Sequence, residues 1–412
     1  MRGRQVLMQS LVAHGVECIF GNPGTTESPL IDSLAEFPQL AYYIALHEGV
    51  ALGAASYYAQ ASGKTPMVNL HVAPGLGNAI GMLYSAMKAN SPLIVTAGQQ
   101  DTRMRLRAPV LSHDLVAMAA PVTKWSVQVE RADEFAPILA RALKIARDPP
   151  SGPVFVGLPI DVMEQETDIA PAPPSALYRG APADERGVAE LARLILGSER
   201  PALVVGDDVA RSGASAHLVR LVEAIGASVW WEGLRARASF PTGHPNARSA
   251  LPLDAAAIAK ALGRADLVLL VGGPFFEEVW FTAGSPFPPA AAVVQIEEAP
   301  ERLAFNFPLA AGLAGALPGT LAALTAAVER QASAGYREAA KRRNAALEQA
   351  SAADAAQQRE RLHKNRDRQP MAMARARAEF RAGAPADTII VDEAITASID
   401  LARSFAFDTT DS

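Results

Sequence analysis

The amino-acid sequence predicts an α/β protein built from doubly wound parallel sheets. Short apolar runs of strand length alternate with segments of helical periodicity, which is the pattern of βαβ units. Several of these runs end in glycine or a polar residue, as strands do where they turn into helices. At 412 residues and 43.4 kDa, the chain exceeds the roughly 250–300 residues at which a single core stops growing. We therefore expect more than one domain.

Composition excludes several classes of function. Half of the residues are hydrophobic and a fifth are charged, as in an ordinary globular protein. The net charge of −5 forms no basic stripe, so nucleic acid is not expected as a partner. The single cysteine, Cys18, excludes an intrachain disulfide and lies in an apolar run, where we expect it to be buried.

The sequence also bears on localisation. The first residues, Met1 to Arg4, lack the apolar segment of a secretory signal. Residues 306–328 carry no charge, but their prolines and glycines fit a strand, a turn and a buried helix better than a membrane span. We expect a cytoplasmic protein without a membrane partner.

The first hundred residues contain four expected strands, at residues 18–20, 42–46, 67–71 and 93–97, after a helix over residues 5–17. The first strand runs into Gly21-Asn22-Pro23-Gly24, where glycine and proline favour a tight turn. Thr25 or Thr26 is expected to cap the following helix. Ligand sites in parallel sheets lie at the carboxyl ends of strands, so this turn, Glu48 and His71 should meet at one edge.

The rest of the chain continues the alternation. A strand at 154–156 closes the first domain and a linker rich in proline and alanine follows at 170–182. A second α/β unit has expected strands at 201–205, 228–231, 267–271 and 292–296. Its strand ends do not form a dinucleotide fingerprint, so a structural role is favoured over NAD or FAD binding. Residues 329–368 are dense in charge and predict a solvated connector. A helix ending near Phe380 and a strand at 388–392 come last.

Glu48 is the candidate centre of a site. It opens a run of small and apolar residues, so it is expected to be carried into the interior, where a carboxylate finds a partner or shifts its pKa upward. The alternative is a surface glutamate in the first turn of a helix, where the helix dipole favours negative charge. The residues of this segment alone leave both interpretations open.

An ordered set of motifs resembles the thiamine diphosphate-dependent 2-oxo acid decarboxylases and acetolactate synthase-like enzymes. Benzoylformate decarboxylase is the member that the chain resembles most. The resemblance covers nearly the whole chain in layout and is dense over the first 160 residues. Its motifs are Phe20-Gly21-Asn22-Pro23-Gly24, Glu48-Gly49-Val50, Tyr58-Ala59-Gln60-Ala61-Ser62, Asn69-Leu70-His71 and the segment from Ser91 to Gln100.

The resemblance implies a domain layout. Residues 1–165 correspond to the N-terminal pyrimidine-binding domain and 185–330 to a Rossmann-like middle domain, joined by a linker at 166–184. Residues 331–369 form a connector. Residues 370–412 correspond to the start of a third, diphosphate-binding α/β domain, which we expect to be truncated.

The resemblance also implies site residues. Glu48 pairs with the ring nitrogen of the aminopyrimidine, His71 matches the proton-shuttling histidine, and Thr25 matches a serine near the substrate carboxylate. A core histidine bonded to backbone is the alternative for His71, and helix capping is the alternative for Thr25. The implied cofactor-binding residues are Asn22, Pro23, Gly24, Glu48, Gly75 and Asn78.

The chain departs from the family in two places. The family holds Mg²⁺ and the diphosphate with a Gly-Asp-Gly segment followed by an asparagine, and neither follows Asp392. We therefore expect no metal ligands in this chain, Mg²⁺ ligands in an absent C-terminal domain, and no activity of the chain alone. Benzoylformate decarboxylase also carries a second catalytic histidine in the middle domain, where this sequence has Glu277, Glu278, Val279 and Trp280.

The function implied is non-oxidative decarboxylation of an aromatic or branched 2-oxo acid with thiamine diphosphate and Mg²⁺. The alternatives are an acetolactate synthase-like carboligase and a non-catalytic binding or assembly protein. A homodimer or tetramer is expected, because the pyrimidine half of one subunit faces the diphosphate half of another in this family. Helices over 49–62 and 76–90 should form the interface through small residues, namely Gly77, Ala79, Gly81, Ala86 and Ala89.

Overall fold

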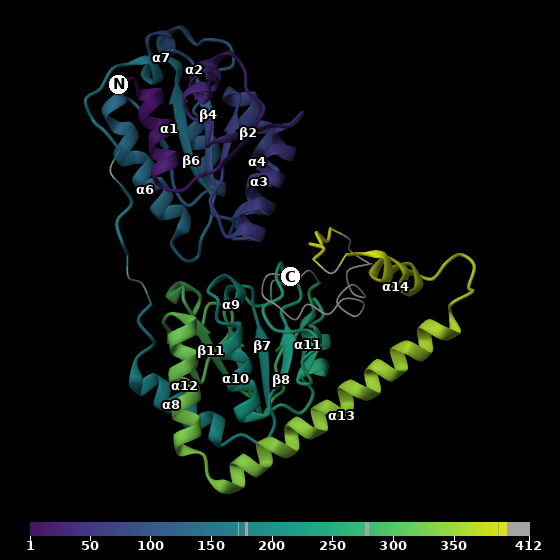
Figure 1. Cartoon of the computed structure of the whole chain (residues 1–412). Coiled ribbons are helices and arrows are strands. Elements are labelled where there is room, and N and C mark those ends of the chain that lie inside the picture. The colour runs from purple at the N-terminus through teal and green to yellow at the C-terminus, as the bar shows by residue number, and fades with distance from the viewer. Residues whose placement is uncertain (172, 178–179, 277–279, 386, 394–412) are drawn as a thin grey trace. The chain divides into compact units, whose positions relative to one another are not determined.

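A computed structural model describes residues 1–171, 173–177, 180–276, 280–385 and 387–393. The chain divides into two compact units, the first of which is Met1–Leu177 (Figure 1). Within the described ranges, no helix combines the length and the apolar character that crossing a bilayer requires.

The first unit is a six-stranded, all-parallel sheet with strand order β2-β1-β3-β4-β6-β5. Its strands are β1 (Cys18–Gly21), β2 (Ala41–Ile44), β3 (Met67–Leu70), β4 (Ile94–Gln99), β5 (Ser126–Gln128) and β6 (Val154–Pro159). Its helices are α1 (Gly3–Ala13), α2 (Ser28–Ser33), α3 (Glu48–Ser62), α4 (Val72–Lys88), α5 (Leu115–Ala119), α6 (Phe135–Arg147) and α7 (Ile160–Glu164).

Helices cover both faces of this sheet, so its core has two halves. One half packs α1 and α6 against side chains such as Ile19 and Val156. The other packs α3 and α4 against Val68 and Val95. The opposite placement of these helix pairs is visible in Figure 1. Cys18 is free and buried, as predicted.

The second unit repeats the architecture, with strand order β12-β11-β10-β7-β8-β9 and parallel pairing throughout. Its strands are β7 (Pro201–Val205), β8 (Ser228–Trp231), β9 (Ala247–Ala250), β10 (Leu267–Val271), β11 (Ala292–Glu297) and β12 (Ala311–Ala314). Its helices are α8 (Glu185–Leu196), α9 (Asp208–Arg211), α10 (Ser215–Ile225), α11 (Ala255–Leu262), α12 (Leu317–Gln331), α13 (Ala334–Lys364) and α14 (Met373–Gly383).

Six short 3₁₀ helices complete the described secondary structure: η1 (Thr25–Glu27), η2 (Leu34–Glu36), η3 (Thr102–Arg107), η4 (Ala120–Val122), η5 (Ala132–Glu134) and η6 (Pro300–Arg302). The predicted doubly wound α/β class is confirmed for both units. The strand, turn and buried helix expected over 306–328 are also observed, as β12 and most of α12.

The connector differs from the predicted solvated segment, because α13 is docked along its first half. Arg343 donates to the Ile225 carbonyl at 2.7 Å and Asn344 donates to the Glu223 carbonyl at 2.8 Å, so α13 satisfies carbonyls at the end of α10. Arg248 donates to the Leu347 carbonyl at 2.9 Å. The remainder of α13 is largely exposed.

The strand predicted at 388–392 is wrong. These residues have an irregular backbone and pair with none of the described strands. A strand persists only when a neighbour completes its ladder of hydrogen bonds, and apolar sequence alone does not supply one. The rest of the predicted third domain, residues 394–412, lies outside the described residues.

Candidate active site

The predicted site residues of the first unit gather at the carboxyl edge of its sheet. Asn22 follows β1, His71 follows β3, and Glu48 is the first residue of α3. The backbone fixes their spacing, because Asn22 N–H donates to the Asn69 carbonyl at 3.2 Å and Ala45 N–H donates to the Gly21 carbonyl at 2.9 Å. The sheet therefore brings together segments that are up to about 50 residues apart in sequence.

Glu48 is buried and held by two amides. Its side chain and backbone together are only 7% exposed. Asn22 Nδ2 donates to Oε1 at 3.1 Å, and Asn78 Nδ2 donates to Oε2 at 3.0 Å. Each carboxylate oxygen has a second acceptor position, so the group can still receive a proton from a ligand. The interior position predicted for Glu48 is observed.

The pKa of the Glu48 carboxyl lies below its usual value, contrary to the shift that burial alone would cause. Burial raises the pKa, and this is the largest single influence. It is outweighed by the sum of the Glu48 backbone N–H, the Asn78 and Asn22 amides, and the nearby His47. The carboxylate is therefore charged at neutral pH without a cationic side chain bonded to it.

His71 belongs to a second cluster at the same edge, with Glu27 and Thr26. His71 Nδ1 lies 2.7 Å from Glu27 Oε2, and Thr26 Oγ donates to Glu27 Oε1 at 2.7 Å. Thr26 Oγ is also 3.3 Å from His71 Nδ1. Glu27 is only 1% exposed. The imidazole is thus bonded to a buried carboxylate, not to backbone.

Glu27 is a site residue that sequence reasoning did not identify. Its carboxylate occupies space left by Gly98 on β4, because a Cβ there would overlap Glu27 Oε1. Glu27 also accepts the Gly24 N–H at 2.8 Å and so caps the 3₁₀ turn that contains it. The only local signal is a glutamate three residues after Gly24, at the spacing of a capping box.

The remaining predicted residues are placed as follows. Gly24 packs against His71, since a Cβ on it would overlap the imidazole ring. A Cβ on Gly75 would lie 3.4 Å from Glu48 Oε1, so this glycine borders the carboxylate. Pro23 is half-buried in the turn between Asn22 and Gly24.

Thr25 is not joined to the cluster. It is exposed, and its carbonyl accepts a hydrogen bond from Ser28 Oγ at 2.6 Å. The expected capping by a threonine is wrong, because η1 and α2 have no side-chain cap from either threonine. Thr26 is the hydroxyl that reaches His71, since the 3₁₀ turn directs it inward.

The two glycines that border Glu48 and His71 place no side chain against these groups. Gly24 and Gly75 keep side-chain atoms away from the two functional groups, and the carboxylate has free acceptor capacity. No group of three or more His, Cys, Asp or Glu side chains in the described ranges is arranged to hold a metal ion.

The corresponding edge of the second unit carries charged groups of a different kind. Asp208 accepts from Arg211 Nη1 at 2.6 Å and from Arg302 Nη1 at 2.6 Å. Glu297, fully buried, accepts from Gly273 N–H at 3.1 Å and Gln295 Nε2 at 3.0 Å. The segment 277–279, where the sequence lacks the family's second histidine, lies outside the described residues.

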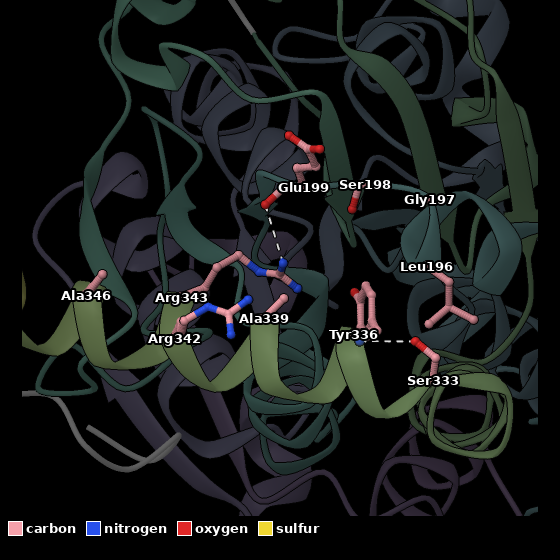
Figure 2. A pocket seen from close by; sticks show the side chains of 10 residues that line it. All are labelled: Leu196, Gly197, Ser198, Glu199, Ser333, Tyr336, Ala339, Arg342, Arg343 and Ala346. Carbon is pink, nitrogen blue, oxygen red and sulfur yellow. Dashed lines mark hydrogen bonds between the residues drawn. The ribbon is translucent and has the colours of Figure 1, made fainter.

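A hollow of about 640 Å³ lies elsewhere in the second unit, between the end of α8 and α13. Figure 2 shows its lining. Its polar groups are used structurally: Ser333 caps α13 by accepting from Tyr336 N–H at 3.1 Å, and Arg343 bonds backbone carbonyls. The hollow holds none of the paired acid and base groups seen at the first unit's edge.

Comparison with known families agrees with this geometry. Residues 1–118 match the model of the thiamine pyrophosphate enzyme N-terminal TPP binding domain, and residues 188–324 match that of the thiamine pyrophosphate enzyme central domain.

Individual relatives give the same result. The chain is 36% identical over 321 residues to a benzoylformate decarboxylase of Pseudomonas aeruginosa. The matched region covers 76% of this chain and 59% of the relative. It is 30% identical over 337 residues to a probable acetolactate synthase large subunit of Methanocaldococcus jannaschii, covering 79% and 56%. The chain thus spans less than two thirds of the length of these relatives.

A solved structure extends the comparison to the whole chain. The thiamine diphosphate-dependent 4-hydroxybenzoylformate decarboxylase of Rhodococcus jostii RHA1 superposes with a TM-score of 0.82 at 28% identity. The match covers 100% of this chain and 74% of that structure.

Proposed function

Because the chain belongs to the thiamine pyrophosphate enzymes, of which it carries the N-terminal and central domains, we propose that it acts in the non-oxidative decarboxylation of a 2-oxo acid. The observation that carries this proposal is the convergence of Glu48 and the His71–Glu27 pair at one sheet edge. One group is a charged carboxylate and the other is an imidazole that can hold a proton.

Glu48, Asn22, Gly24, Gly75 and Asn78 are the residues that would hold the aminopyrimidine end of thiamine diphosphate. When bound, this cofactor supplies the thiazolium carbon that attacks a 2-oxo acid and takes up the electrons released with carbon dioxide. Glu48 would share a proton with a ring nitrogen of the bound aminopyrimidine. The amides of Asn22 and Asn78 keep its two oxygens in place for that exchange.

His71 is the proposed proton source for the substrate carbon. Glu27 bonds one ring nitrogen, Nδ1, at 2.7 Å, and this bond fixes the orientation of the imidazole ring. The other nitrogen, Nε2, makes no hydrogen bond to the described residues, so it is available to a ligand. Glu27 is a positioning residue in this scheme.

The proton source favours decarboxylation over carboligation. A decarboxylase must protonate the carbon that has lost carbon dioxide, whereas a carboligase must keep protons away until a second carbonyl arrives. The His71–Glu27 pair serves the first outcome. The similarity to acetolactate synthases keeps carboligation as the second candidate. A non-catalytic assembly role is less favoured, because it gives no reason to bury two carboxylates, Glu27 and Glu48, at one sheet edge.

An apolar loop beside the site supports an aromatic or branched substrate. Val110 is 79% exposed, and the neighbouring Leu111 carbonyl accepts the Ala73 N–H at 3.4 Å. This bond holds the loop against the first turn of α4, directly after His71. Apolar side chains that border a polar centre are typical of sites that orient a small organic ligand.

The proposal includes Mg²⁺ to neutralise the diphosphate, and a homodimer or tetramer. Assembly is supported by large apolar side chains on β2, on α3 and between them that face solvent in the isolated chain. They are Tyr43, Ile44, Leu46, Val50 and Tyr57. The small residues predicted for the interface are partly wrong: Ala79 and Ala86 are fully buried in their own unit's core, because they lie on the sheet-facing side of α4. A cytoplasmic location stays a prediction.

The test is Glu48→Gln in an active preparation that contains this chain, assayed with thiamine diphosphate and Mg²⁺. Glutamine keeps the shape but cannot share the proton, so turnover of aromatic and branched 2-oxo acids should fall by about 100-fold or more. The control is Glu185→Gln, an exposed carboxylate at the start of α8, which should leave turnover unchanged.

Two results would contradict the proposal. Unchanged turnover in Glu48→Gln would remove the carboxylate from the chemistry. Acetohydroxy acids as the only products would replace decarboxylation by carboligation.

A further inference from the structure

His47, the residue before Glu48, caps the N-terminus of α3, the helix that begins with Glu48. His47 is the N-cap of α3, with an extended backbone at φ −153° and ψ 141°. Its Nδ1 accepts the Gly49 N–H at 3.0 Å. Its carbonyl accepts the N–H groups of Val50 at 3.0 Å and Ala51 at 3.1 Å. His47 therefore satisfies three of the N–H groups at the start of this helix.

A histidine is an unusual choice for this task. N-caps are most often Ser, Thr, Asp or Asn, whose oxygens accept at every ordinary pH. An imidazole nitrogen accepts only while it carries a lone pair, so Nδ1 must be unprotonated for the Gly49 bond to exist. The bond fixes the tautomer of His47 with its proton on Nε2.

The residues around the His47 imidazole leave room for the ring. A Cβ on Gly49 would lie 3.1 Å from His47 Nδ1 and 3.6 Å from Met82 Cγ, so glycine leaves room for the imidazole against the helix. Glu48 is the charged group that interacts electrostatically with His47, and the α4 side chain at this point is the neutral thioether of Met82. In the isolated chain His47 is exposed to solvent.

Glu48 depends on this cap because it is the first residue of the helix. Its own N–H bond and its side-chain bonds to Asn22 and Asn78 all require α3 to begin at this residue. Fraying of the first turn would free the backbone that carries the carboxylate. The cap is one of the few contacts that prevent it.

We propose that His47 is a positioning residue that sets Glu48 by capping α3, and that it does so only in its neutral form. This inference rests on the proposed function for the role of Glu48. Protonation places an N–H on both ring nitrogens, so Nδ1 then faces the Gly49 N–H as a second donor. The cap is therefore lost when the ring takes up a proton on acidification.

Hydrogen exchange of the Gly49 amide in the full chain tests the cap directly, because it needs neither cofactor nor turnover. In the wild-type protein the protection factor of this amide should be roughly 5- to 10-fold lower at pH 5.5 than at pH 8, the scale of a lost N-cap. ¹⁵N shifts of His47 should show the Nε2–H tautomer at pH 8. The protection factor already corrects for the pH dependence of chemical exchange.

Two variants separate the cap from other effects of pH. His47→Asn replaces the imidazole by an acceptor that does not titrate, so protection of Gly49 should stay high at both pH values. His47→Ala removes the acceptor, so protection should be low at both. The protection factors of amides in α3 beyond its first turn should be the same in the wild type and in both variants.

The second readout is the pH profile of turnover in an active preparation. His47→Asn should retain the wild-type plateau near pH 8 and lose less activity on acidification, whereas Glu48→Gln lowers the plateau itself. Wild-type protection of Gly49 that is equal at both pH values, or that falls equally in His47→Asn, would overturn the inference. These results are independent of whether the substrate is a 2-oxo acid.

Discussion

The carboxyl edges of the two sheets hold buried carboxylates by opposite means. In the first unit, Glu48 is bonded to neutral amides and Glu27 to a hydroxyl and an imidazole. In the second unit, Asp208 is held between two guanidinium groups, from Arg211 and Arg302. The architecture is the same six-stranded parallel sheet in both cases.

The difference in partners decides what each edge can do. Arginine does not give up its proton in proteins, so a carboxylate bonded to it is fixed as a charge pair. Amides, hydroxyls and imidazole orient a carboxylate and leave its protonation free to change. Glu48 at the first edge is thus suited to proton exchange with a ligand, whereas Asp208 at the second edge is suited to holding its own unit together.

The largest expected effect lies in the second unit. Arg302 Nη1 donates to Asp208 Oδ2 and to the Gly273 carbonyl, both at 2.6 Å. Arg302→Met would leave Asp208 and the nearby Glu297 with less compensation inside a buried region, at a cost of about 3–5 kcal/mol in the free energy of unfolding. Urea unfolding followed by tryptophan fluorescence in a Trp125→Phe background measures it, because the other three tryptophans lie in this unit.

The matched control for Arg302→Met is Arg193→Met. Arg193 pairs with Glu190 on the exposed face of α8, where solvent weakens the attraction, so its loss should cost far less than the loss of Arg302. Equal costs for the two substitutions would mean that the second unit's edge is no more dependent on its arginine than an open surface is.

The next effect concerns Glu297 and pH. Burial raises the pKa of its carboxyl to about 7, against the lowering influence of Gln295, the Gly273 N–H and Arg302. The folded chain therefore binds this proton more tightly than the unfolded chain. The resulting stability, about 3 kcal/mol, is present below a pH of about 4.5 and is lost as the pH rises through about 7.

Glu297→Gln tests this assignment, because glutamine stays neutral throughout. Between pH 5 and 8, unfolding of the second unit should become less pH-dependent in the variant than in the wild type. Glu199→Gln, an exposed carboxylate of the same unit, should leave the slope unchanged. An unaltered slope in Glu297→Gln would show that another group causes the pH dependence.

Most of the fold followed from the apolar runs, and its omissions have one cause. The central strands β3, β7 and β10 are buried on both faces, so they appear as continuous apolar segments in the sequence. The strands that the sequence did not predict, β5 and β9, lie at sheet edges, where one neighbour is enough. The sequence of β9, Ala-Arg-Ser-Ala, carries no local strand signal.

The sequence predicted the site residues whose position depends on the end of one strand or the start of one helix. It did not predict a residue whose position depends on two segments that are distant in sequence. Asn22 and Glu48 meet as expected because one follows β1 and the other opens α3, and Asn78 reaches Glu48 from within α4. Glu27 was missed because its burial depends on Gly98, about 70 residues away in sequence. The sequence around Glu27 gives no indication that Gly98 leaves room for its side chain.

The smallest expected effect returns to the neutral bonds beneath the first edge. Tyr42 donates to Oδ1 of the fully buried Asn69 at 3.1 Å, and Asn69 Nδ2 donates to Thr96 Oγ at 3.4 Å. Tyr42→Phe removes one neutral hydrogen bond, so it should cost about 1 kcal/mol, less than the loss of Arg302. Hydrogen exchange of peptides that contain β3 measures this cost in the first unit alone.

The control for Tyr42→Phe is Tyr57→Phe, whose residue is 43% exposed on α3 and should change protection by less than about 0.5 kcal/mol. Because Asn69 also receives the Asn22 N–H on its carbonyl, the Tyr42 bond steadies the turn that carries Asn22 to Glu48. If Tyr42→Phe cost as much free energy of unfolding as Arg302→Met, the neutral hydrogen bonds of the first unit would stabilise it as strongly as the ion pairs stabilise the second. The proposed difference between the two sheet edges would then be wrong.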